Sequence, residues 1–105
     1  MNLGELFKQA KDVQARAEAM QAQLAAIEIE GISGAEMVRV VLNGKGELKR
    51  VAIDPSLLRP EDAHVVQDLI VAAHADAKVK LERRVADEMK KLAGSLGLPP
   101  GLGLG

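Results

Sequence analysis

Apolar residues recur every three or four positions along the first 27 residues of this chain, without a slip. The positions are Leu3, Leu6, Ala10, Val13, Ala17, Met20, Leu24 and Ile27. This alternation is the heptad pattern of helices that pack against other helices. No proline interrupts it, and Asn2 is a residue type preferred as a helix N-cap. The pattern predicts one long helix from Leu3 to Ile27 with an apolar seam along one side.

A helix of that length needs more packing surface than the remaining chain supplies. At ~1.5 Å per residue it should be ~37 Å long. The chain has 105 residues, and a compact domain of about this size has a radius of gyration of only ~13 Å. A second copy of the chain is the simplest partner for the seam, so we expect a homodimer.

The apolar period changes from helical to twofold after residue 27. Ile27 and Ile29 alternate with acids, and Val38, Val40 and Leu42 form a second alternating run. Gly31 and Gly34 punctuate the interval between the runs. Residues 43–46, Asn-Gly-Lys-Gly, are a strong hairpin signal, because Asn and Gly accept positive φ. Residues 48–53 are the returning strand, with Val51 and Ile53 on one face, which gives three short antiparallel strands.

A second helical pattern follows the sheet. Asp54-Pro55-Ser56 ends the last strand, and Pro60-Glu61-Asp62 is a typical helix opening. Apolar residues then recur at helical spacing to about Ala93, and Gly94 is expected to stop the helix. The predicted fold is therefore α+β, with an αβββα subunit. We expect one domain over residues 1–94 and a flexible Gly-, Leu- and Pro-rich tail over 95–105.

The composition argues against an enzyme. The chain has no cysteine and no threonine, and His64 and His74 lack the spacing and neighbours of a metal site. Gly44-Lys45-Gly46 lacks the spacing of a phosphate loop. We therefore expect no catalysis, no cofactor and no small-molecule substrate. No apolar run approaches the ~20 residues of a membrane helix, and no signal peptide is evident, so we expect a cytoplasmic protein without a membrane partner.

The net charge of −1 gives no overall basic excess, so a nucleic-acid site must come from uneven charge distribution. Four cations of the second helix lie within ~100° of one another at ~100° per residue, and we call them the basic stripe: Lys80, Arg83, Arg84 and Lys91. Acids interleave with them, so the residues alone leave phosphate contact and a solvated face equally open. Lys8 and Lys11 share an outer face of the first helix. Phe7 is the single aromatic residue, which favours duplex over single-stranded DNA.

Four segments resemble the YbaB/EbfC family, in the right order along the chain. They are Leu6-Phe7-Lys8-Gln9-Ala10-Lys11, Glu30-Gly31-Ile32-Ser33-Gly34-Ala35, Arg50-Val51-Ala52-Ile53-Asp54-Pro55-Ser56-Leu57-Leu58 and Leu98-Pro99-Pro100-Gly101. The second of these segments resembles the family's first turn, so Gly31 is expected in a turn. The resemblance implies a tweezer-like αβββα homodimer, associated with the nucleoid, that binds double-stranded DNA with weak sequence preference and no cofactor. The resemblance favours phosphate contact by the basic stripe, and Lys8 and Lys11 are the next candidates. The alternative is a coiled-coil-like adaptor or chaperone dimer that does not bind DNA.

Overall fold

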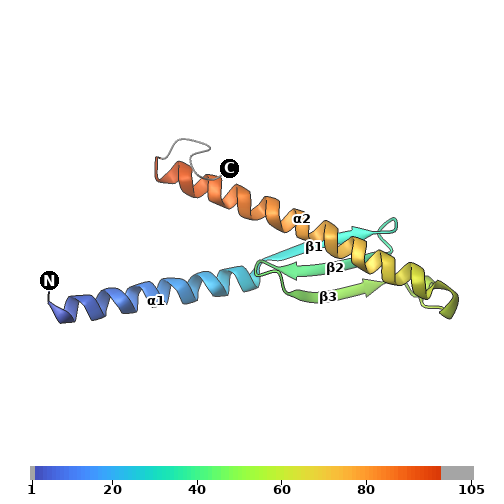
Figure 1. Ribbon diagram of the computed structural model, residues 1–105, viewed down its shortest axis with the longest axis horizontal. Helices are drawn as coiled ribbons and strands as arrows, with labels where there is room; N and C mark the ends of the chain where they lie inside the picture. The colour runs from blue at the N-terminus through green and yellow to red at the C-terminus, as the bar shows by residue number, and fades with distance from the viewer. Residues whose placement is uncertain (1, 98–105) are drawn as a thin grey trace.

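The computed structural model describes residues 2–97. Figure 1 shows the order α1 (Leu3–Ala26), β1 (Glu28–Ser33), β2 (Val38–Asn43), β3 (Leu48–Ile53) and α2 (Ala63–Ser95). Two short 3₁₀ turns, Pro55–Leu57 and Pro60–Asp62, connect β3 to α2. The predicted αβββα subunit of the α+β class is confirmed. The molecule is elongated, at 69 × 32 × 15 Å with a radius of gyration of 19.9 Å, because both helices extend beyond the sheet.

Among residues 2–97, helix α1 contacts the rest of the subunit only near its C-terminal end. The Asn2 side chain accepts a hydrogen bond from the backbone N–H of Glu5 at 2.8 Å, which confirms the predicted cap. No residue of α1 is buried, and Val13 and Met20 of the apolar seam are 66% and 61% exposed. At the other end, the Leu24 carbonyl accepts a hydrogen bond from the Gly44 N–H at 2.8 Å. Ile27, at the end of the seam, packs against the core, but the seam from Leu3 to Met20 stays exposed within the described part of the subunit.

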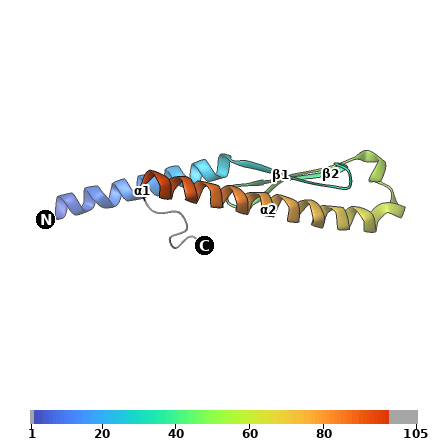
Figure 2. The same ribbon diagram turned by 90° about the horizontal axis from the view of Figure 1, so that it is seen from above.

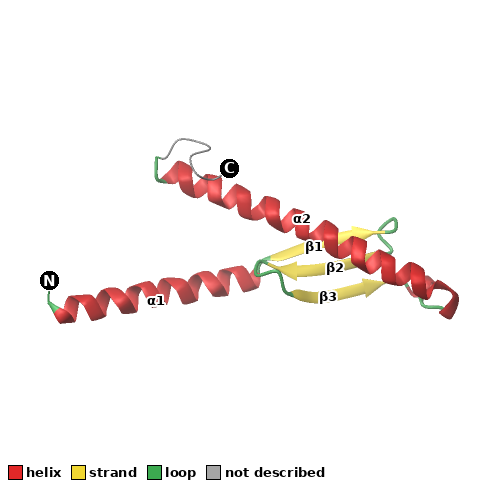
Figure 3. Ribbon diagram, in the orientation of Figure 1, coloured by secondary structure: helices red, strands yellow, loops and turns green. Residues whose placement is uncertain are grey.

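The sheet is a meander in the order β1-β2-β3, with both pairs antiparallel (Figure 3). Gly31, Val40 and Val51 are aligned across it and so share one face. Val41 pairs with Arg50 while Leu42 pairs with Leu48, so β3 carries one extra residue in a bulge. The predicted hairpin at 43–46 is confirmed, and so is the common face of Val51 and Ile53.

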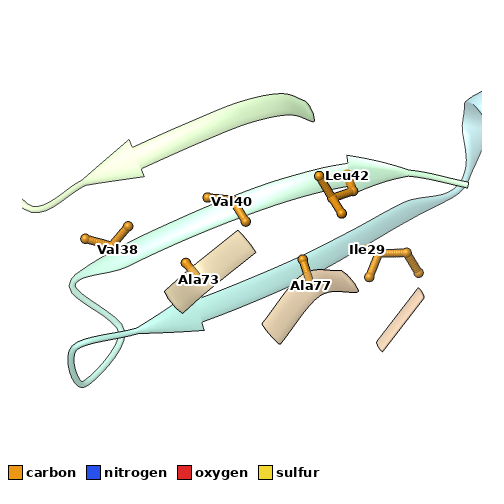
Figure 4. Close-up of a cluster of buried hydrophobic side chains, with 6 residues drawn as sticks. All are labelled: Ile29, Val38, Val40, Leu42, Ala73 and Ala77. Atoms are coloured by element: carbon orange, nitrogen blue, oxygen red, sulfur yellow. The ribbon is translucent and has the colours of Figure 1, made fainter. Parts of the chain in front are cut away.

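Helix α2 covers one face of the sheet, over β1 and β2 (Figure 1). The core between these layers consists of Ile29, Val38, Val40, Leu42, Ala73 and Ala77 (Figure 4). Two alanines facing the sheet let α2 approach closely. On the same face of β3, Leu48 and Val51 remain 52% and 41% exposed. On the apolar face of the sheet, α2 thus covers β1 and β2 and leaves β3 open.

Gly31 lies inside β1, and not in a turn as the sequence suggested. A Cβ atom there would stand 2.0 Å from the Ala73 carbonyl oxygen and 2.5 Å from the Ala77 nitrogen. This glycine is therefore a packing residue that admits the α2 backbone. The turn starts only at Gly34, and it holds Gly34, Ala35 and Glu36 at positive φ values of 59°, 55° and 71°.

The boundaries of the helices differ slightly from those expected. Helix α1 ends at Ala26, and the predicted opening of the second helix, Pro60–Asp62, is a separate 3₁₀ turn. Helix α2 also continues through Gly94 to Ser95, so the prediction that Gly94 ends it is wrong. Glycine in a helix costs only about 1 kcal/mol relative to alanine, and the positive φ typical of a helix end belongs to Gly97, at 73°. Most of the expected flexible tail, residues 98–105, lies outside the described residues, and that expectation stays a prediction.

Candidate nucleic-acid interface

Two arms leave the sheet at the same end of the molecule (Figures 1 and 2). One arm is α1, and the other is the distal part of α2 after Leu81. An apolar crevice of about 430 Å³ lies where they diverge. Its lining is Met20, Gln23, Leu24, Ile27, Gly44, Leu81, Arg84, Val85, Glu88, Met89 and Leu92. Each arm therefore presents apolar residues to the crevice.

The charge of α2 changes sign along its length. Residues 60–77 contain four acids and no lysine or arginine, a net charge of −4. Residues 78–95 contain six lysines and arginines and three acids, a net charge of +3. The positive half is the half that leaves the sheet, so a chain with a net charge of −1 still has a basic arm. Such local excess is the usual electrostatic footprint of a phosphate contact.

Lys80, the first member of the basic stripe, is engaged within the subunit. Its Nζ lies 2.8 Å from Asp76 Oδ2 and donates to the Glu30 carbonyl at 3.1 Å. Asp76 also accepts a hydrogen bond from the Ile32 N–H at 2.9 Å. The hydrogen bonds from Lys80 and then from Ile32 lower the pKa of Asp76 below its usual value. Lys80 thus helps to hold α2 on the edge of β1.

The stripe continues the packing face of α2 rather than its outer face. At ~100° per residue, Ala73, Ala77, Lys80, Arg84 and Lys91 all lie within a sector of ~60°. Beyond the sheet only Arg84 of this sector lines the crevice, and the side chain of Lys91 is 74% exposed. Arg84 and Lys91 each lie 3.7 Å from one carboxylate, that of Glu88. Two cations therefore share one counter-charge.

Three candidate cations have no ion pair among residues 2–97: Arg83, Lys8 and Lys11. Arg83 lies on the basic arm, and the two lysines are exposed on the outer half of α1. Of the six candidates, five therefore lie on the arms beyond the sheet, and Lys80 alone lies against it.

The arginines of the sheet are neutralised by cross-strand ion pairs. Arg50 lies 2.6 Å from Glu28, and Arg39 lies 2.9 Å from Glu30 and 3.2 Å from Glu36. Sequence reasoning missed the Arg50–Glu28 pair because the two residues lie on β3 and β1, which do not pair with each other, and only the order of the strands brings them together. The sheet therefore offers less free positive charge than the arms.

Among residues 2–97, no group of three histidine or acidic side chains is arranged to hold a metal ion. Within the same range, neither helix has a stretch apolar enough and long enough to cross a membrane.

Comparison with known proteins identifies the family. The model of the YbaB/EbfC DNA-binding family matches residues 1–96. A nucleoid-associated protein of Granulibacter bethesdensis is 52% identical over 103 residues, which are 98% of this chain and 96% of that protein. One of Rhodospirillum centenum is also 52% identical over 103 residues, with the same coverage. The crystal structure of an uncharacterized Helicobacter pylori protein matches with a TM-score of 0.63 and 27% identity, over 91% of this chain and 97% of that one. The chain belongs to the YbaB/EbfC DNA-binding family.

Proposed function

We propose that this protein is a non-enzymatic, nucleoid-associated homodimer that holds duplex DNA through phosphate contacts, with weak sequence preference. The observation that carries the proposal is the coincidence, in a member of a DNA-binding family, of a basic arm with cations that have few internal partners. The relatives named above are called nucleoid-associated, which supports the same location in the cytoplasm for this chain.

The homodimer is supported by the exposed seam of α1. A helix gains most of its stability from packing an apolar face, and isolated helices are marginal in water. Here 24 residues form a helix in which no side chain is buried. Seam residues from Leu3 to Met20 would remain in contact with water in a single subunit. A second copy would cover them without any further component.

The phosphate contacts are supported by the unequal pairing of the cations. Arg83, Lys8 and Lys11 have no ion pair among the described residues, and Arg84 and Lys91 share Glu88. Neutralising a phosphate releases condensed counterions, so exposed cations of this kind contribute affinity that depends on salt and not on base sequence. One phenylalanine cannot provide a stacking platform for single strands, which favours duplex DNA.

A gel shift with duplex DNA at several salt concentrations tests the proposal. Log affinity should fall linearly with log salt, at a slope of about −0.9 per phosphate contacted. Arg83→Ala combined with Arg84→Ala should weaken binding and reduce the slope, by about two for each side chain that both copies use. Lys45→Ala, at the hairpin beside Glu47, is the matched control and should change neither. Wild-type affinity and slope in the double variant would place the contact elsewhere, with Lys8 and Lys11 next to be tested.

The crevice favours one alternative function, that of an adaptor whose arms hold a helix of another protein. Its lining is dominated by Leu, Met, Val and Ile side chains, which would suit the apolar side of such a helix. The same gel shift separates the two functions. A wild-type protein that binds no duplex even at low salt would reject the DNA proposal and favour the adaptor.

A further inference from the structure

The basic arm carries an acid between two of its candidate cations. Glu88 lies four residues after Arg84 and three before Lys91, and these spacings bring side chains together on a helix. The Arg84 Nε and the Lys91 Nζ each lie 3.7 Å from the same atom, Glu88 Oε1. Arg84 and Glu88 also belong to the lining of the crevice between the arms. Two positive groups therefore converge on one anionic oxygen beside the crevice.

The contacts of Glu88 are much looser than those of the ion pairs on the sheet. On the sheet, Arg50 Nη2 donates to both carboxylate oxygens of Glu28, at 2.6 Å and 3.1 Å. At Glu88 both distances exceed hydrogen-bonding range, and the side chains of Arg84, Glu88 and Lys91 are 49%, 55% and 74% exposed. Exposed pairs of this kind contribute little to stability, because water and salt screen them. Glu88 can therefore leave the two cations at small cost.

A DNA phosphate is chemically equivalent to the Glu88 carboxylate at this position. Arginine binds carboxylate and phosphate oxygens with the same fork of donors, and lysine binds either group as a point charge. The phosphate has one advantage, since its neutralisation by the protein releases counterions condensed on the DNA. A carboxylate of the same chain brings no such gain. A phosphate would therefore compete with Glu88 for the two cations, most effectively at low salt.

We infer that Glu88 occupies the position of a DNA phosphate between Arg84 and Lys91 and is displaced when duplex DNA binds, so that it limits the affinity of the basic arm. This inference rests on the proposed function and assigns a regulator to the same site. Without DNA, Glu88 keeps the two cations close to each other. With DNA, it competes with the phosphate for them. The basic arm consequently binds duplex less tightly than its cations alone would allow.

Asp87 offers a matched comparison on the same arm. It is adjacent to Glu88 in the sequence and carries the same charge. At ~100° per residue it projects between Arg83 and Arg84, within the sector of the basic stripe. Asp87 nevertheless has no ion pair among residues 2–97. Neutralising Asp87 therefore removes only its general repulsion of DNA, whereas neutralising Glu88 also frees two cations.

Gel shifts with one duplex at several salt concentrations compare Glu88→Gln with its control, Asp87→Asn. Both changes keep the size of the side chain and raise the net charge by the same amount. At low salt, Glu88→Gln should raise the affinity at least about threefold more than Asp87→Asn does, because it releases two ion pairs in each copy. This excess should shrink as salt screens the pairs. Equal gains from the two variants at low salt would overturn the inference.

The same comparison in a background of Arg84→Ala with Lys91→Ala tests whether these cations carry the effect. The three candidate cations without an ion pair remain in this background to bind DNA. Glu88 then has no cation to withhold, so the gain from Glu88→Gln should fall to that from Asp87→Asn. An excess that persists would overturn the inference and leave DNA binding intact. If neither the wild type nor Glu88→Gln binds duplex even at low salt, the proposed function is rejected together with the inference, whereas binding by Glu88→Gln alone would support the inference.

Discussion

The contact between Gly31 and α2 gives the most direct test of how the subunit is packed. A Cβ added at Gly31 would meet the Ala73 carbonyl oxygen at 2.0 Å and the Ala77 Cβ at 2.6 Å. Both belong to the α2 backbone or to its first side-chain atom, so neither can rotate away. Restoring an ordinary contact of 3.4 Å to the carbonyl oxygen requires a separation of about 1.4 Å between β1 and α2.

The energetic cost of Gly31→Ala follows from that displacement. Overpacking a core costs about 1–3 kcal/mol. The shift would also stretch the 2.9 Å bond from Ile32 to Asp76 beyond hydrogen-bonding distance, which adds to this cost. We therefore expect Gly31→Ala to lower the free energy of unfolding by about 3 kcal/mol, the upper end of the overpacking range, which is a large part of the total for a small domain.

Urea denaturation followed by circular dichroism measures this loss. Gly94→Ala is the matched control, because nothing lies within 4 Å of a Cβ at that helical position. The control should raise stability by up to about 1 kcal/mol, since alanine is the better helix former. The same substitution should thus have opposite signs at the two sites. A loss below about 0.5 kcal/mol for Gly31→Ala would refute direct packing of α2 on β1.

Three further predictions concern the turns and the β1 edge. Asn43 is 1% exposed, and its side chain accepts hydrogen bonds from two backbone N–H groups of the hairpin. Asn43→Ala removes both bonds and should lower the free energy of unfolding, measured by urea denaturation, by about 2–3 kcal/mol. An unchanged urea midpoint would contradict this. The φ of 55° at Ala35 strains any residue that has a Cβ. Ala35→Gly should therefore stabilise the fold by about 0.5–1 kcal/mol and raise the melting temperature. A lower melting temperature would count against that strain. The lowered pKa of Asp76 means that its ionised form stabilises the fold above the unfolded pKa, and that this stability is lost as the pH falls through the folded pKa. Asp76→Asn should therefore flatten the decline in melting temperature below about pH 4, and an unaltered acid profile would exclude the role of the carboxylate.

The elements of the fold could be predicted because each has its own period. The three-four alternation before residue 27, the twofold alternation around Val40 and the Asn-Gly turn are local signals, and each identified an element that the structure contains. The two misread glycines have a common explanation. Gly31 was interpreted as part of a turn and Gly94 as a helix end. The sequence does not distinguish such glycines from one needed for close packing, as at Gly31, or one tolerated within a helix, as at Gly94.

The candidate site could be predicted only in part. The basic stripe on α2 follows from helical spacing, but helical spacing does not say which residues of other elements contact the stripe. Lys80 contacts Glu30, fifty residues earlier in the chain, and this depends on how α2 crosses β1. For the same reason the sequence could not reveal that Arg84 faces the crevice between the arms. Long-range placement, and not the type of residue, separates an engaged lysine from one free to meet a phosphate.

The attachment of α1 through the Leu24–Gly44 hydrogen bond makes the helix a lever with its pivot at one end. A Cβ at Gly44 would stand 2.7 Å from the Leu24 carbonyl oxygen, so only glycine lets the two backbones touch there. The 24 residues of α1 span about 36 Å, and a rotation of 10° at the pivot moves the far end by about 6 Å. A very small change in the hairpin is therefore amplified at the tip of the arm. The position of Lys8 and Lys11, near the far end of α1, therefore depends on the contacts that Leu24 and Ile27 make at the sheet.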